Sequence, residues 1–109
     1  MNKVKISNKK LAKMNSFSDV FIAELSKSKK KQKLYLETAF EDYKTTQDLP
    51  HFLLAVRNIA IAKGGIIELS KKTNLNRQTI YKALSNKGNP SFVILNLILT
   101  SLDVELRIH

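Results

Sequence analysis

The chain of 109 residues contains no cysteine and no tryptophan, and only three glycines and two prolines. The absence of cysteine excludes a disulfide framework, a thiolate metal site and a cysteine nucleophile, and it suits a cytoplasmic protein. No apolar run approaches the ~20 residues of a membrane-spanning helix. The lysine-bearing N-terminus is not followed by the apolar block of a signal peptide. We therefore expect one small cytoplasmic domain with a modest core and no membrane partner.

Residue patterns for catalysis and metal binding are also lacking. His51 and His109 lie far apart in the sequence and have no carboxylate at metal-ligand spacing, so we interpret both as structural or solvated. Glu41 and Asp42 are adjacent and would point in different directions on a helix, which gives no carboxylate pair for acid–base chemistry. We therefore predict that the protein is not an enzyme and has no cofactor and no metal site.

Positive charge is unevenly distributed along the chain. The net charge is +10, from 19 basic and 9 acidic residues. Residues 1–33 hold ten lysines and two acidic residues, a net of +8, whereas residues 34–109 hold nine basic and seven acidic residues, a net of +2. Within this nearly neutral part, residues 63–87 hold six basic residues and one acidic residue. A locally basic surface of this kind is the footprint expected for contact with the DNA phosphate backbone.

The stretch at 65–84 has the spacing of two short helices joined by a tight turn, a helix-turn-helix. Asn74 occupies the turn, and Asn is the non-glycine residue that best tolerates a left-handed backbone. Leu75 follows as an apolar plug, and Asn76 is a good N-cap for the second helix. Ser70 is small enough for the two helices to cross closely. The turn chemistry therefore predicts two helices that cross closely.

The outer face of the second helix, expected over 77–85, carries the candidate DNA contacts. With Ile80 and Leu84 on the buried side, about 100° per residue places Gln78 and Lys82 on the far face. Gln can form two hydrogen bonds with adenine, and Lys can reach guanine or phosphate. The candidate DNA-binding residues are Asn76, Arg77, Gln78, Thr79, Tyr81, Lys82 and Lys87. The alternative interpretation is an ordinary amphipathic hairpin with a solvated polar face.

The N-terminal part is predicted to contain a basic arm and a helical segment. Residues 1–15 are rich in lysine and asparagine, and we interpret them either as an arm with a short strand or as a frayed terminus. Ser16–Leu25 and Leu34–Lys44 each place apolar side chains on one helical face. The basic run at 26–33 is either a linker or the start of the second helix. The expected organisation is a basic arm over 1–15, a helical segment over 16–47, and a DNA-binding and dimerisation domain over 48–109.

A further helix is expected between these segments and the helix-turn-helix. Asp48 suits its N-cap, Pro50 lies in its first turn, and Gly64-Gly65 ends it. Leu54 and Ile61 form a second apolar stripe that could receive an upstream helix. Its core stripe consists of Phe52, Leu53, Val56, Ile59 and Ala60.

A last helix, which Ser91 caps or opens, runs to about Leu102. It is apolar nearly all round, and such a helix must be covered on more than one side. Val104–His109 then alternates apolar and polar residues like a strand. A lone strand needs a partner, which is either residues 3–6 or the same strand of a second copy. We therefore expect a homodimer through Leu95, Leu99, Leu102, Val104, Leu106 and Ile108.

A family resemblance is carried by residues 55–108, which read AVRNIAIAKGGIIELSKKTNLNRQTIYKALSNKGNPSFVILNLILTSLDVELRI. This run resembles the addiction-module antidote proteins, small λ-repressor-like helix-turn-helix regulators related to HigA-type antitoxins. The most specific pieces are AKGG at 62–65, LNRQTIYKALS at 75–85 and GNP at 88–90. A weaker match at 24–43 is similar to the family's N-terminal helices. Asn74 and Asp103 stand where the family usually has glycine.

The resemblance implies a mainly α fold: a λ-repressor-like helical bundle with N-terminal helices, to which the pattern at 104–109 adds a short C-terminal β-strand. It implies a cytoplasmic, dimeric antitoxin of a type II toxin–antitoxin module. Such a protein would neutralise a RelE/ParE-like toxin and repress its own operon through operator DNA. Carried over by position, the DNA-facing set would be Asn76, Arg77, Gln78, Tyr81 and Lys82.

Two alternatives to the antitoxin remain open at this point. The first is a stand-alone helix-turn-helix transcriptional regulator without a toxin partner. The second is a protein-interaction module in which the apolar last helix matters and the basic face is incidental. A neighbouring toxin gene would separate the antitoxin from the first alternative, and a DNA-binding assay would test the second.

Overall fold

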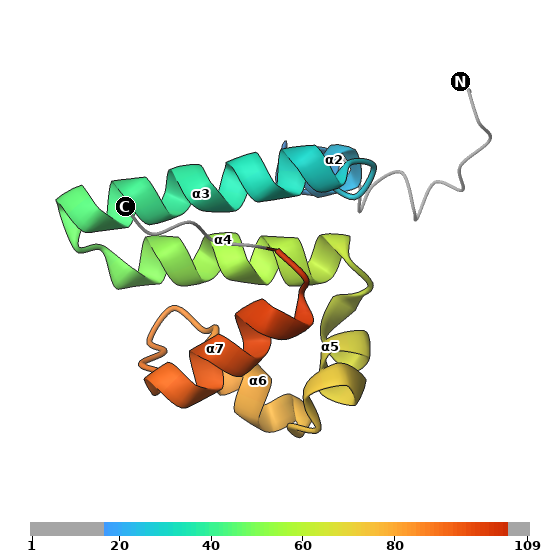
Figure 1. Cartoon of the computed structure of the whole chain (residues 1–109), viewed down its shortest axis with the longest axis vertical. Coiled ribbons are helices and arrows are strands. Elements are labelled where there is room, and N and C mark those ends of the chain that lie inside the picture. Colours follow the sequence, from blue (N-terminus) through green and yellow to red (C-terminus); the bar gives the residue numbers. More distant parts are fainter. Residues whose placement is uncertain (1–16, 105–109) are drawn as a thin grey trace.

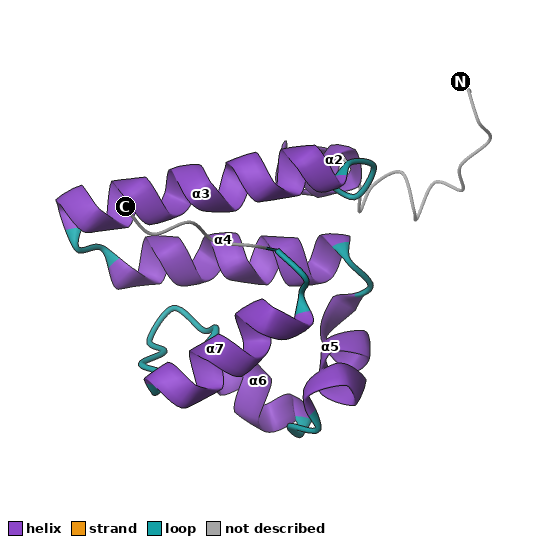
Figure 2. Ribbon diagram, viewed as in Figure 1, coloured by secondary structure: helices purple, strands orange, loops and turns teal. Residues whose placement is uncertain are grey.

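The computed structural model describes residues 17–104, and this part of the chain is helical with no strand (Figure 2). The expected mainly α fold is therefore confirmed. The helices, labelled as in Figure 1, are α2 (Phe17–Leu25), α3 (Lys29–Thr46), α4 (Leu49–Ala62), α5 (Gly65–Thr73), α6 (Arg77–Ala83) and α7 (Phe92–Ser101). The basic arm predicted over 1–15 lies outside the described residues.

α4 is the central helix of the structure (Figure 1). α3 runs alongside it and α2 also contacts it, while α5 contacts it from the helix-turn-helix side. The rings of Phe40 and Tyr43 on α3 lie with their centroids 5.9 Å from the ring of Phe52 on α4. The predicted core stripe of α4 is buried, namely Phe52, Leu53, Val56, Ile59 and Ala60, together with Ala55. Because α4 buries side chains against α3 and against α5, it holds the α5–α6 pair against the N-terminal helices.

The second apolar stripe of α4 is covered only in part. α2 contacts α4, as the sequence predicts for an upstream helix. Nevertheless Leu54 and Ile61 remain 39% and 45% exposed. Between α2 and α4 lies an open hollow of about 460 Å³, lined on the α4 side by Leu54, Arg57, Asn58 and Ile61.

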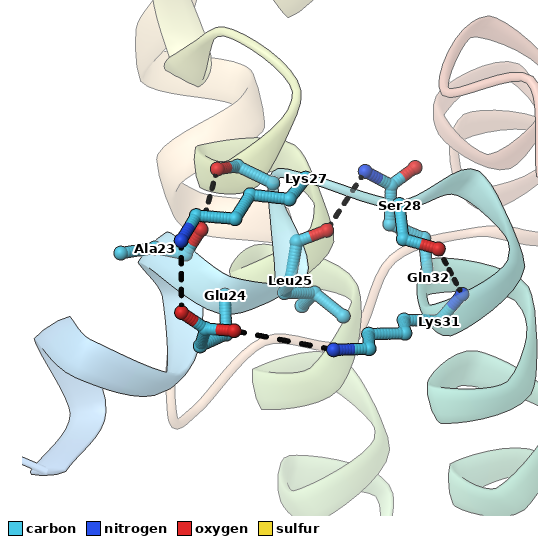
Figure 3. A network of polar contacts seen from close by, with 8 residues as sticks. Ala23, Glu24, Leu25, Lys27, Ser28, Lys31 and Gln32 are labelled. Atoms are coloured by element: carbon cyan, nitrogen blue, oxygen red, sulfur yellow. Dashed lines mark hydrogen bonds and ion pairs between the residues drawn. The ribbon is translucent and has the colours of Figure 1, made fainter.

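Polar contacts hold the junction between α2 and α3 (Figure 3). Ser28 is the N-cap of α3, and its Oγ accepts a hydrogen bond from the N–H of Lys31 at 3.2 Å. Gln32 is 5% exposed, and its Nε2 donates to the carbonyl of Leu25 at 3.1 Å. The amide of Gln32 thereby satisfies a carbonyl at the end of α2, where the helix leaves it without an intrahelical partner.

α3 is longer than the periodic segment Leu34–Lys44. It begins at Lys29, so from Lys29 onward the basic run is the start of the helix, one of the two interpretations left open by the sequence. It also continues through Thr46 and ends at Gln47, which has φ 59°. The low apolar content of the first turns left both interpretations open, because only the Ser28 cap signals the start locally.

The other helix ends follow the predicted caps. The N–H groups of His51, Thr79 and Ile94 donate to the side-chain oxygens of Asp48, Asn76 and Ser91, at 3.2, 2.8 and 3.2 Å. Gly64, with φ 119°, separates α4 from α5. Because capping acts over a few residues, it is readable from sequence.

The expected C-terminal strand over Val104–His109 is not borne out. Val104 is in no strand and is 8% exposed, packed in the core directly after the left-handed turn at Asp103. Residues 105–109 lie outside the described part of the chain. Val104 therefore extends the helical core, because the chain turns inward at Asp103 and buries it.

Candidate nucleic-acid interface

The turn between α5 and α6 is held by side-chain hydrogen bonds. Asn74 has φ 63° and ψ 13°, the left-handed backbone that the sequence predicts. Thr73 Oγ1 donates to the carbonyl of Leu69 at 2.9 Å and accepts from the N–H of Leu75 at 3.1 Å. Ser70 Oγ donates to the carbonyl of Leu75 at 2.6 Å. The sequence analysis gave Ser70 only a steric role and missed Thr73, although both hydroxyls can satisfy a turn backbone.

α6 has one buried face and one exposed face. Ile80 and Leu84 are 0% and 1% exposed, as predicted. Ala83 is also buried, whereas Leu75, expected to be a buried plug, is only half-buried against the core. Because this helix is only seven residues long, its position depends on these tertiary contacts rather than on helix propensity.

The predicted DNA contacts lie on α6 and in the residues that flank it. We call these residues the α6 surface, namely Asn76, Arg77, Gln78, Thr79, Tyr81, Lys82 and Lys87; Thr79 is half-buried and the others are exposed. Thr79, Lys82 and Lys87 line one hollow of about 400 Å³ between α6 and the loop that leads to α7. Since Asn76 Oδ1 accepts the N-cap hydrogen bond, a further contact from Asn76 would come from its amide NH₂.

The loop between α6 and α7 packs tightly against the end of α6. The N–H of Gly88 donates to the carbonyl of Ser85 at 2.9 Å. A Cβ at Gly88 would lie 2.3 Å from the backbone oxygen of Ala83. Only glycine therefore fits this position without backbone movement. This close contact fixes the position of the loop backbone next to Lys87.

A second basic cluster, which the sequence analysis missed, surrounds Asp103 after α7. Lys29 Nζ lies 3.2 Å from Asp103 Oδ2. This hydrogen bond, with the charges of Lys29, Lys63 and Lys72, holds the pKa of Asp103 below its usual value. Partial burial and the charge of Lys29 lower the pKa of Lys63. No local sequence signal joins these lysines, because they come from α3, the end of α4 and α5.

The residues of the predicted dimer interface lie in different environments. Leu102 is 4% exposed and packs in the core with Val104, while Leu95 and Leu99 are half-buried against that core. Leu106 and Ile108 lie outside the described residues. The apolar side chains that α7 exposes are instead Phe92, Val93 and Leu97, at 82%, 67% and 38%.

Residues 17–104 carry neither of two other kinds of functional feature. No helix there is long and apolar enough to cross a membrane. No group of three or more His, Cys, Asp or Glu side chains could hold a metal ion. The prominent feature of this part of the chain is thus the paired helices α5 and α6 with their exposed basic face.

The fold and this surface define a small helical protein built around a helix–turn–helix pair. The family model described as "Probable addiction module antidote protein" matches residues 15–109. The chain belongs to this family. The resemblance noted in the sequence is therefore confirmed, and membership in an antidote family implies a toxin partner in general.

A relative from Haemophilus influenzae is named only as an uncharacterized protein. It is 26% identical over 91 residues, which cover 84% of this chain and 89% of the relative. No solved structure gives a significant match.

Proposed function

We propose that this protein is an antitoxin that binds operator DNA through the α6 surface and represses its own operon. The observation that carries the DNA part is the division of α6 into a buried face and an exposed basic face. Ile80 and Leu84 anchor one face, Lys82 is exposed on the other, and Arg77 is exposed in the first turn. This arrangement suits a λ-repressor-like recognition helix in the major groove.

The α6 surface has the chemistry for both parts of DNA recognition. Gln78 supplies a side chain that can form two hydrogen bonds with adenine. Arg77, Lys82 and Lys87 supply positive charges for phosphate contacts, which give affinity without sequence information. The hollow beside Lys82 and Lys87 gives room for a sugar–phosphate segment next to the helix.

The proposed partners follow from the family and from symmetry. Membership in the antidote family supports a toxin partner, and we assign it to the RelE/ParE-like class. One helix-turn-helix reads only a few base pairs, so we expect a homodimer that reads both half-sites of a palindromic operator. DNA reading and dimerisation are assigned to residues 48–109. The alternative is a stand-alone regulator of the same fold with no toxin partner, acting in the cytoplasm.

A promoter-binding experiment tests the DNA part of the proposal. Arg77→Ala and Lys82→Ala should each weaken binding to the promoter of the protein's own gene, while circular dichroism stays as in the wild type. Each lost phosphate contact should reduce the slope of log affinity against log salt by about 0.9. Gln78→Ala should relax base preference at one position by about 1–3 kcal/mol.

The matched control is Lys44→Ala on α3, across α4 from α6, which should bind the promoter as the wild type does. If all three α6 variants also bind like the wild type, α6 is not the recognition helix. The toxin part is tested separately by co-expressing the product of the adjacent gene with this protein. Failure of that product to co-purify and to be neutralised would favour the stand-alone regulator.

A further inference from the structure

A long-range hydrogen bond joins the central helix to the end of the recognition helix. Arg57 Nη1, on α4, donates to the backbone carbonyl of Leu84. Leu84 is the C-cap of α6, and its own N–H bonds back to the carbonyl of Ile80. The two partners are 27 positions apart in the sequence. Arg57 therefore caps the α6 helix from another element.

The chemistry of this contact suits a helix C-terminus. The last carbonyls of a helix lack intrahelical N–H partners, and the helix dipole places partial negative charge there. An arginine supplies both donors and a positive charge at such an end. A hydrogen bond from a charged donor is also stronger than one between neutral groups.

The shortness of α6 makes an external anchor consequential. Its N-terminal end is held by the Asn76 cap, and its middle by the fully buried Ile80. At the C-terminal end Ser85 Oγ donates to the carbonyl of Lys82 at 3.0 Å, and Arg57 donates to the carbonyl of Leu84 from another helix. Because the loop carrying Lys87 follows this end directly, a shift there would move both α6 and the loop.

Arg57 lies on α4 beside residues that face the N-terminal helices. It is half-buried and shares the lining of the α2–α4 hollow with Leu54 and Asn58. The next residue, Asn58, donates from Nδ2 to the hydroxyl of Tyr35 on α3 at 3.0 Å. Arg57 thus connects α6 to the same surface of α4 that contacts the N-terminal helices.

We propose that Arg57 is a positioning residue for DNA recognition, which sets the orientation of α6 by capping it at Leu84 and makes no contact with DNA itself. This inference rests on the proposed function. It predicts that loss of the Arg57 side chain lowers the preference for operator over random DNA. It also predicts that the number of phosphate contacts stays the same.

The test compares Arg57→Met with Arg77→Met, two substitutions that remove the same charged group and keep an unbranched apolar side chain. Arg57→Met should bind a promoter fragment at least tenfold more weakly, in keeping with loss of a charged hydrogen bond. Its affinity for a random duplex and its salt slope should equal those of the wild type. Arg77→Met should instead show a shallower salt slope on both DNAs.

A readout without DNA separates positioning from general destabilisation. Amide hydrogen exchange of residues 80–84 should be at least tenfold faster in Arg57→Met, whereas the amides of α4 should exchange as in the wild type. Arg57→Lys keeps a charge and a donor, so it should restore part of the operator preference. The proposal is overturned if Arg57→Met keeps full operator preference, if its salt slope falls by about 0.9, or if every helix loses protection equally.

The outcome also distinguishes this proposal from the function on which it rests. If the wild type shows no preference for the promoter fragment, the proposed function is wrong and the role of Arg57 in DNA binding is wrong with it. If the wild type prefers the promoter and Arg57→Met does so equally, only the assignment of Arg57 fails.

Discussion

Three residues of the described chain adopt a left-handed backbone conformation that glycine would adopt with less strain. Gln47, Asn74 and Asp103 are the non-glycine residues with positive φ among those described, at 59°, 63° and 54°. Asn and Asp tolerate this conformation through local hydrogen bonds, whereas Gln has no such advantage. Gln47 compensates with hydrogen bonds from its Nε2 to the carbonyls of Tyr43 and Lys44. These bonds are exposed to water, so they offset little of the strain.

Gln47→Gly should therefore stabilise the protein. The relief of left-handed strain exceeds the entropy that glycine adds to the unfolded chain, for a net gain of about 0.5–1 kcal/mol. Asn74→Gly, the matched change at a tolerant residue, should gain less. Urea denaturation followed by circular dichroism measures both. A Gln47→Gly variant less stable than the wild type would show that the side-chain bonds outweigh the strain.

Gly88→Ala should have the opposite effect, because the added methyl would overlap the Ala83 carbonyl. Forcing the loop away from α6 should cost about 1–3 kcal/mol. Asn89→Ala in the same loop is exposed and serves as the control, with an expected change within about 0.5 kcal/mol. Thermal unfolding of the two variants gives the comparison. Equal midpoints would mean that the loop relaxes freely around Gly88.

At the scale of elements, α6 depends on its buried face. Ile80→Ala should destabilise the protein by about 2–5 kcal/mol, because Ile80 is 0% exposed and the change leaves a cavity. Leu75→Ala should cost clearly less, since Leu75 is only half-buried. Urea denaturation measures the difference. If the two variants lose equal stability, the Leu75 side chain is packed as tightly as that of Ile80.

Helix starts and stops in this chain were largely predictable. The caps at Asp48, Asn76 and Ser91 are formed as the sequence predicts, because each depends on residues three positions apart. The start of α3 was left open between a linker and a helix, since its first turn is made of lysines that carry no apolar period. Of the strand expected after Asp103 only Val104 is described, and it is in no strand and is buried in the core of the chain.

At the scale of the whole molecule, α7 exposes an apolar row next to the α6–α7 loop. Phe92, Val93 and Leu97 are the exposed members, and a second copy covering them would complete the proposed homodimer. Two recognition helices would then lie about 34–36 Å apart on successive major grooves.

Phe92→Asp should therefore give a folded monomer that binds the promoter weakly. Leu99→Asp is the contrasting variant, because Leu99 packs against the chain's own core, and it should unfold the protein instead. Sedimentation with circular dichroism separates the two outcomes. A wild type that stays monomeric at tens of micromolar would refute the homodimer. A Phe92→Asp variant that still forms dimers would show that the dimer interface lies on another surface.

The sequence by itself determined the helical fold, the position of the turn, the buried Ile80 and Leu84, and the exposed residues of the α6 surface. These features depend on helical periodicity and on caps, which act between residues a few positions apart. The tertiary structure alone decided which row of α7 is exposed, that Arg57 caps α6, and that Lys29 reaches Asp103. The last two contacts join residues 27 and 74 positions apart. Such pairs form only when the packing of buried side chains brings their helices together, and no local pattern records that geometry.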